Sequence, residues 1–189
     1  ANGYLLKPVS FERLSEEIDF VFSKRQEPQP EPDIEEAEAD TWETENPRAE
    51  IFAHTFGNFD IYKGRVPVHF ARSKSKELLA YLVDRRGSSV TRAEAFAVLW
   101  GDRLFDRPMQ KQFDVIIRGL RASLQERGIE EILEIRNGSM RIRPELIDCD
   151  MYRFCNGEAA AVNEYRGKYM NGYSWAELTE GYMTQKLKN

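Results

Sequence analysis

The chain has 189 residues and a mass of 22.0 kDa, with 41% hydrophobic and 31% charged residues, enough for one or two domains with a real core. It contains no apolar run of the roughly 18 residues that a membrane span needs, and no charged-then-apolar signal segment begins it. Cys149 and Cys155 have neither CxxC spacing nor a neighbouring histidine, which excludes a disulfide framework and a zinc site. A reduced, cytoplasmic protein is expected.

The net charge of −5 is unevenly distributed along the chain. Residues 1–50 hold 14 acidic against 5 basic residues, whereas residues 51–150 hold 17 basic against 14 acidic residues. Residues 26–50 contain ten acids and four prolines, a composition that repels itself and buries little apolar surface. It predicts an extended acidic linker; an acidic surface loop of a single domain is the alternative. The chain after the linker is a modestly basic module.

Residues 1–25 predict one strand and one helix. The apolar run Tyr4-Leu5-Leu6 leads into Lys7-Pro8, and apolar residues then recur at helical spacing from Phe11 to Phe22. One strand and one helix cannot form a core alone, so this segment is expected to be the end of a larger domain or an element that docks on a partner.

Strands followed by three helices are predicted after the linker. The expected strands are residues 51–56, 59–62 and 66–70, the last at a sheet edge because it contains proline. Ser73 or Ser75 should cap the first helix, and Thr91 with Glu94 forms a capping box for a short second helix. Asp106, with a proline two residues later, should open a long third helix that ends at Gly128.

The third helix has two different faces. Its predicted core stripe is Phe113, Ile116, Ile117, Leu120 and Leu124. The opposite face and its flanks carry Lys111, Gln112, Val115, Arg118, Gly119, Arg121 and Ala122. A major groove admits one helix that presents long donors with small residues between them. Gly119 disfavours a helix by about 1 kcal/mol relative to alanine, so a close approach of some other group to the helix is expected there. A solvated helix face is the alternative.

A β-hairpin is predicted after the third helix. Asn137-Gly138 is a strong two-residue turn signal, and it pairs Leu133 with Ile142, Glu134 with Arg141, Ile135 with Met140 and Arg136 with Ser139. Arg136 and Arg143 share the polar face and are expected to contact a minor groove or phosphates, while Arg141 is neutralised by Glu134. A plain surface hairpin is the alternative.

No residues point to an enzyme. His54 and His69 are expected to be ordinary strand residues, because neither has a carboxylate or cysteine at ligand spacing. The chain lacks a nucleophile elbow, a P-loop, GxGxxG and HExxH, so no catalytic residue, metal ligand or cofactor is predicted.

Five short motifs follow one another over residues 51–155: Thr55-Phe56-Gly57-Asn58-Phe59, Lys76-Glu77-Leu78-Leu79-Ala80-Tyr81-Leu82, Val90-Thr91-Arg92, Leu99-Trp100-Gly101 and Ile117-Arg118-Gly119-Leu120-Arg121. In this order they resemble the winged-helix DNA-binding domain of OmpR/PhoB-type response regulators, in the version found in antibiotic-regulatory proteins of the SARP family. The resemblance implies an α+β fold: an N-terminal sheet, a winged helix-turn-helix over residues 51–149 and a wing hairpin.

The first 25 residues resemble the last strand and helix of a receiver domain. In that family the lysine at the position of Lys7 contacts the phosphoryl group. The resemblance implies a two-component response regulator truncated through its receiver, with an upstream sensor histidine kinase. Double-stranded DNA, RNA polymerase and a second copy of the chain are the other implied partners.

Residues 150–189 contain Asp150-Met151-Tyr152-Arg153-Phe154 and Tyr165-Arg166-Gly167-Lys168-Tyr169. These two motifs resemble the opening of the tetratricopeptide-like activation domain of SARP regulators. The length of this segment fits one helical hairpin that turns near Asn171-Gly172. Four aromatic residues are expected to pack this hairpin on the winged helix: Tyr169, Tyr173, Trp175 and Tyr182. The leading interpretation of the whole chain is a sequence-specific transcription regulator; the alternative is a winged-helix module that binds protein and no DNA.

Overall fold

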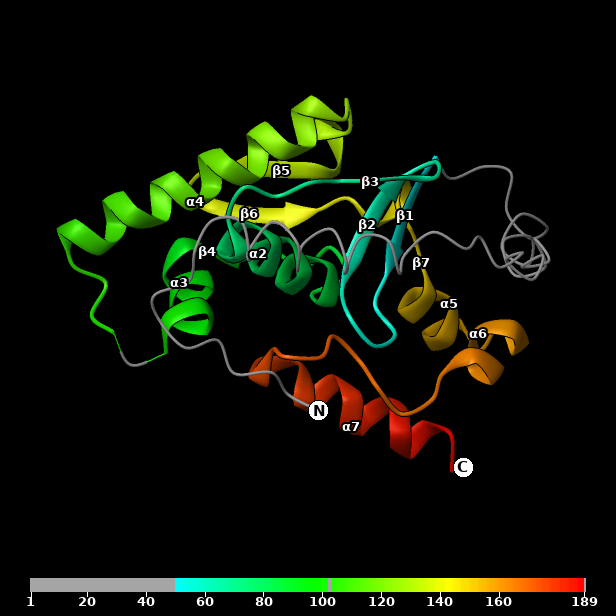
Figure 1. The fold of residues 1–189 in the computed structure, drawn as a ribbon. Helices are drawn as coiled ribbons and strands as arrows, with labels where there is room; N and C mark the ends of the chain where they lie inside the picture. Colours follow the sequence, from blue (N-terminus) through cyan, green and yellow to red (C-terminus); the bar gives the residue numbers. More distant parts are fainter. Residues whose placement is uncertain (1–49, 102, 189) are drawn as a thin grey trace, which may run out of the picture. The chain divides into compact units, whose positions relative to one another are not determined.

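The computed structural model describes residues 50–101 and 103–188, which lie within one compact unit (Figure 1). The segments 1–25 and 26–49, and Lys7 with them, lie outside the described residues. Within the part described, no helix is long and apolar enough to cross a membrane.

The first sheet has four strands in the order β3-β2-β1-β7. These are β1 (Ile51–His54), β2 (Asp60–Lys63), β3 (Val66–Pro67) and β7 (Asp148–Cys149). β1 pairs antiparallel with β2 and parallel with β7, which comes from the far end of the domain. Ile51, Ala53 and Ile61 are buried, whereas Phe52 and Tyr62 on the other face are partly exposed, so one face of the sheet covers the core. The predicted third strand ends at Pro67, three residues early.

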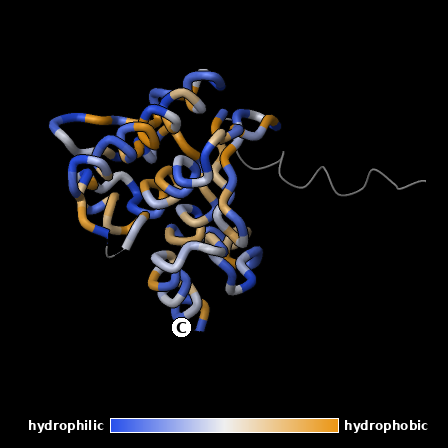
Figure 2. The backbone as a smooth tube through the Cα atoms, turned by 60° about the vertical axis from the view of Figure 1, so that its left-hand side comes forward, coloured by the Kyte–Doolittle hydropathy of each residue, from blue (hydrophilic) through white to orange (hydrophobic). Residues whose placement is uncertain are grey.

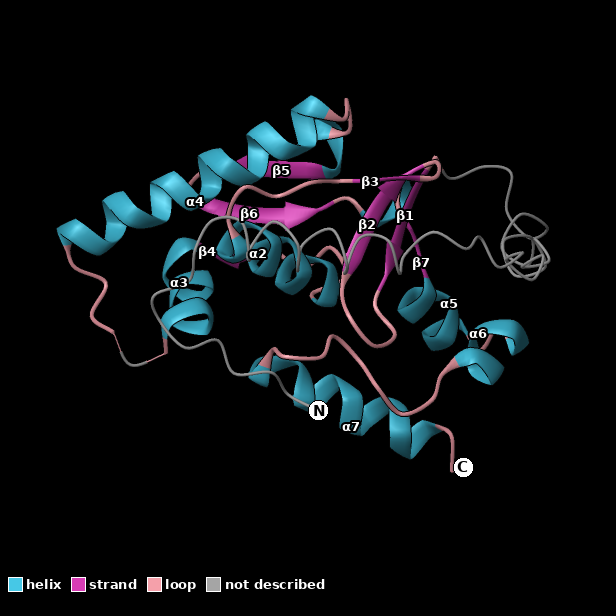
Figure 3. Cartoon of the chain, viewed as in Figure 1, coloured by secondary structure: helices cyan, strands magenta, loops and turns pink. Residues whose placement is uncertain are grey.

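Three helices come next (Figure 3). They are α2 (Ser73–Asp84), α3 (Arg92–Trp100) and α4 (Arg107–Glu126), and α3 and α4 both pack on α2. The predicted capping box of α3 is confirmed, because Thr91 N donates to Glu94 Oε2 at 2.7 Å and Glu94 N donates to Thr91 Oγ1 at 3.2 Å. The predicted serine cap of α2 is wrong: Arg72 is the N-cap and makes no side-chain cap, while Ser75 is buried against α4.

The second sheet contains the hairpin. Its strands β4 (Val90–Thr91), β6 (Ser139–Ile142) and β5 (Leu133–Arg136) lie in the order β4-β6-β5. The four residue pairs of β5 and β6 are those that the turn signal predicts. Asn137 and Gly138 have φ values of +50° and +77°, as a tight turn with two left-handed residues requires. Helices α2, α3 and α4 with this hairpin form a winged helix-turn-helix.

Residues 150–188 do not form one helical hairpin. They contain α5 (Asp150–Asn156), α6 (Ala159–Glu164) and α7 (Glu177–Lys186). The non-helical segment 165–173 and a short 3-10 turn (Ser174–Ala176) separate α6 from α7. The helical hairpin fails because the segment 165–173 bonds to the loop after β1: Met170 N donates to the Thr55 carbonyl at 2.9 Å, and Gly57 N donates to the Lys168 carbonyl at 3.0 Å. The C-terminal helices lie on the side of the domain away from α4 (Figure 1).

The aromatic contacts of the C-terminal segment follow the prediction in part. Tyr169 is 2% exposed and donates to Asp84 Oδ1 at 2.9 Å. Trp175 stacks on Tyr173 and meets Tyr81 of α2 edge-on, each pair with 5.3 Å between ring centroids. Tyr182 is 51% exposed, so its predicted packing role is wrong.

Candidate nucleic-acid interface

Helix α4 begins where the sequence predicts. Asp106 is its N-cap and accepts from Met109 N at 3.0 Å, and Pro108 lies in the first turn. Twenty residues at the usual rise make a helix about 30 Å long. Arg127 caps the other end, and Gly128 follows with a φ of +61°.

The two faces of α4 differ sharply in burial. The predicted core stripe is buried throughout: Phe113, Ile116, Ile117, Leu120 and Leu124. The exposed residues of the helix include Lys111, Gln112, Arg118 and Arg121. Figure 2 shows hydrophobic and hydrophilic residues in alternation along the helices. Neither Lys111, Arg118 nor Arg121 makes an ion pair with another residue of the described part of the chain. Their charges are therefore available to an external anion.

One acid, Asp114, lies on the basic side of α4. Its Oδ1 pairs with Nη2 of Arg92, the first residue of α3, rather than with Arg118 one turn along α4. The Arg92 guanidinium lies 5.4 Å from the ring centroid of Phe113, and Arg92 N donates to the Gly138 carbonyl at 3.2 Å. Arg92 thus joins α3, α4 and the hairpin turn. Arg92 is not among the site residues predicted from the sequence. Asp114, an acid between the basic residues 111, 118 and 121, is the sequence signal for such a partner.

Gly119 lies where α4 packs closely on α2. A Cβ at this position would lie 2.9 Å from Ser75 Oγ of α2, and Ser75 Oγ donates to the Ile116 carbonyl at 2.9 Å. The glycine therefore serves the close packing of α4 on α2, which is a close approach of the kind that a glycine inside a helix predicts. A contact of Gly119 with DNA stays a prediction. Val115 is partly buried and lies at the border of the exposed face.

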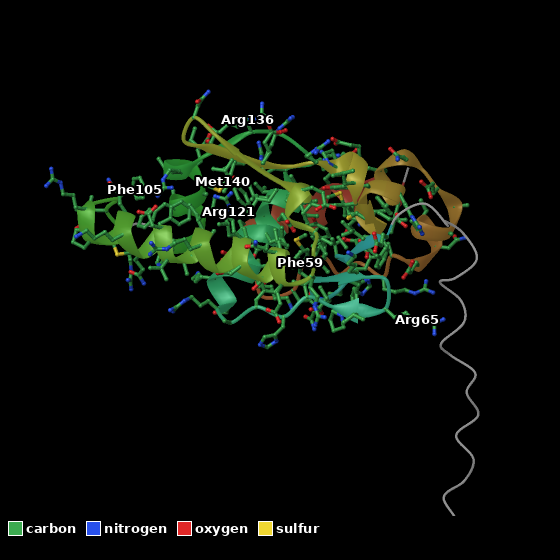
Figure 4. The ribbon with its side chains drawn as sticks, turned by 90° about the horizontal axis from the view of Figure 1, so that it is seen from above. Phe59, Arg65, Phe105, Arg121, Arg136 and Met140 are labelled. Carbon is green, nitrogen blue, oxygen red and sulfur yellow. The ribbon has the colours of Figure 1, made fainter. Side chains whose placement is uncertain are left out.

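The hairpin carries three arginines, each beside a glutamate. Glu134 contacts both Arg136, at 2.7 Å, and Arg141, at 2.6 Å. Arg143 pairs with Glu145 at 3.1 Å. The prediction that only Arg141 is neutralised is wrong, because Glu134 and Arg136 lie two residues apart in one strand and share a face. Figure 4 shows Arg121 on α4 and Arg136 on the neighbouring hairpin.

Glu134 of the hairpin stays ionised at a lower pH than an ordinary glutamate does. The hydrogen bond from Arg141, with the charge of Arg136, lowers the pKa of Glu134 below its ordinary value. Its side chain is 19% exposed, whereas that of Arg136 is 80% exposed. Arg136 can therefore exchange Glu134 for an external phosphate while its guanidinium stays in water.

Comparisons with known proteins give a fold and no family. No protein-family model matches the chain, and no curated protein matches it. Among solved structures, EmbR of Mycobacterium tuberculosis in complex with a low-affinity phosphopeptide is similar, with a TM-score of 0.63 and 18% identity. The match covers 74% of this chain and 43% of the EmbR chain, so this chain spans less than half of that protein.

Proposed function

We propose that residues 50–188 form a sequence-specific, double-stranded DNA-binding transcription regulator. The observation that carries the proposal is the exposed face of α4, where Lys111, Arg118 and Arg121 point away from the core without an acidic partner among the described residues. A helix of this length fits a major groove about 12 Å wide, and arginine recognises guanine edges or phosphates.

Each exposed residue of α4 has a role that follows from its position. Arg118 lies opposite the buried stripe and reaches farthest toward base edges. Lys111 and Arg121 lie nearer the ends of this face and suit phosphates, while Gln112 on the flank suits adenine. Val115 offers a methyl contact to thymine from the border of the face.

Two further groups of residues would position the protein on the duplex. Arg92 lies between α4 and the turn of the hairpin, where the DNA backbone must pass if α4 occupies one groove and the wing the next. Arg136 and Arg143 would contact the minor groove or its phosphates after leaving Glu134 and Glu145.

The finer assignment depends on the resemblance to SARP and OmpR/PhoB regulators. The likeness to EmbR supports the fold. We propose the output part of a two-component response regulator, with Lys7 in a receiver domain, a sensor histidine kinase upstream, and RNA polymerase and a second copy as partners. The receiver assignment depends on residues outside the described part of the chain.

Selection of duplexes from a random pool tests the proposal. The full chain should enrich one short sequence motif. The Arg118→Ala variant should bind the enriched duplex more weakly than the parent does. Failure to enrich any duplex would overturn DNA binding and favour the alternative, a winged-helix module that binds protein only. That alternative draws support from the net charge of −5.

A further inference from the structure

A buried carboxylate lies where the C-terminal segment meets the winged helix. Asp150, the first residue of α5, is 3% exposed and accepts hydrogen bonds from Thr55 N at 2.8 Å, Phe56 N at 3.0 Å and Met151 N at 2.7 Å. The Thr55 hydroxyl also donates to it. Asp150 and Thr55 are 95 residues apart in the chain, so this contact joins β1 to α5 across the domain.

A histidine completes this cluster. His54 Nδ1 lies 3.0 Å from Asp150 Oδ2, and the imidazole is 38% exposed while the carboxylate side chain is 4% exposed. The ring stacks on Phe52 at 6.4 Å between centroids. An ionised carboxylate accepts only, so Nδ1 carries a proton in this contact, and Nε2 is left to bind a second proton from solvent. The expectation that His54 is an ordinary strand residue without a carboxylate partner is therefore wrong.

Three acids of the described residues act on the charge of His54. They are Asp150 of α5, Glu164 of α6 and Asp60 of β2, the residue paired with His54 across the sheet. The hydrogen bond to Asp150 raises the pKa of His54, burial lowers it, and the charges of Asp150, Glu164 and Asp60 raise it, so the pKa lies above the ordinary 6.5. Asp60 also pairs with Lys76 of α2, which leaves Asp150 and Glu164 as the principal partners of the imidazole.

The loop that this cluster holds is also the loop that receives the C-terminal segment. Thr55 and Phe56 donate their amides to Asp150, while the Thr55 carbonyl accepts from Met170 N and the Gly57 carbonyl accepts from Asn171 N at 2.6 Å. Phe56 and Tyr169 form an isolated bridge in the same place. Loosening of Asp150 would therefore loosen both α5 and the segment 165–173.

We propose that His54, Thr55 and Asp150 form a proton-dependent clasp that fastens residues 150–188 to the winged helix, tighter when His54 is protonated. This is a regulatory device of the fold and does not depend on DNA binding. The stabilisation is fully present below pH 6.5, the ordinary pKa of histidine, and is lost as the pH rises through the higher pKa of the folded state. Each unit of pKa difference corresponds to a tenfold tighter clasp in the protonated form.

The first test measures the titration of both histidines of the full chain by NMR. The chain has two histidines, and His69, which is exposed, serves as the internal control. His54→Gln keeps an amide donor for Asp150 but cannot titrate, and it assigns the signals. Glu164→Gln should lower the pKa of His54 without touching the hydrogen bond. Titration of His54 at or below the ordinary pKa of 6.5 would overturn the proposal.

The second test measures amide exchange at Thr55, Phe56 and Met170 in the parent and in His54→Gln. The protection in the parent divided by that in the variant should be larger at about pH 5.5 than at about pH 8.5, by about tenfold for each unit by which the measured pKa of His54 exceeds 6.5. His69→Gln should leave the same ratio near one at both pH values. A ratio that does not change with pH in His54→Gln would show that the clasp is merely structural.

Discussion

Arg118 lies at the centre of the exposed face of α4, opposite Leu120 and Ile116 of the core stripe. Replacing it by alanine removes a charge that has no partner among the described residues, so folding should be little affected. If Arg118 reaches a base or phosphate, its loss should weaken binding to a selected duplex by about 1–3 kcal/mol. Titration of the labelled duplex with parent and variant measures the difference.

A matched control for this variant is Arg166→Ala. Arg166 is equally exposed but lies in the segment between α6 and α7, on the side of the domain away from α4. Its loss should leave the affinity nearly unchanged. Equal affinities of the parent and Arg118→Ala for the selected duplex would remove Arg118 from the interface.

Gly119 and Ser75 make a second prediction at this scale. Gly119→Ala should gain about 1 kcal/mol of helix propensity. Its Cβ, however, would displace Ser75 Oγ from the Ile116 carbonyl. The buried Ser75 hydroxyl would then lack a partner, which costs about 1–3 kcal/mol. The substitution should therefore destabilise the parent. In Ser75→Ala, where the nearest side-chain carbon of residue 75 lies 4.0 Å away, it should be neutral or stabilising.

Denaturant unfolding of the four proteins of this cycle measures the coupling between the two positions. The same cost of Gly119→Ala in both backgrounds would show that Ser75 is not the obstacle. Sequence alone could identify Gly119 as unusual in a helix, but could not tell whether the close neighbour is DNA or α2, because that depends on a contact between residues 41 positions apart or more.

The elements of the winged helix follow from local sequence signals. The capping box at Thr91, the Asp106 cap and the Asn137-Gly138 turn each act within a few residues, so their predicted positions agree with the structure. The prediction that Arg136 has no acidic partner fails for an equally local reason. A strand places residues two apart on the same face, so Glu134 forms ion pairs with both Arg136 and Arg141.

This shared acid gives a prediction for the hairpin. Glu134→Gln should free Arg136 and Arg141 together and raise the affinity for DNA. The gain should be less than about tenfold, because exposed ion pairs are weak. It should be the same for selected and random duplexes, because phosphate contacts do not specify sequence. Competition binding with both duplexes measures the two affinities. Glu145→Gln, which frees only Arg143, is the matched variant.

A gain confined to the selected duplex would instead mean that the hairpin reads bases. Unchanged affinities in both variants would mean that the hairpin lies outside the interface. The pairing of Glu134 with both arginines also predicts that Arg136→Ala and Arg141→Ala have similar effects, which replaces the unequal effects expected from the sequence.

At the scale of the whole molecule, the path of the C-terminal segment is the part that sequence patterns could not give. The segment 165–173 has no periodic pattern, and its partners lie at residues 55–57. The parallel pairing of β7 with β1 and the carboxylate of Asp150 hold the two ends of the domain together. Such contacts join residues far apart in the sequence, so local sequence patterns do not reveal them. Local patterns alone therefore predict a simple helical hairpin.

The salt dependence of duplex binding tests the central claim most directly. For the parent and the selected duplex, the logarithm of the binding constant should fall linearly with the logarithm of the salt concentration, with a slope of about −0.9 for each phosphate contacted. Arg121→Ala, and Arg92→Ala in a second experiment, should each make the slope shallower by about one, whereas Arg166→Ala should leave it unchanged. Absence of duplex binding, or binding that does not respond to salt, would contradict the account of α4 as a DNA-reading helix.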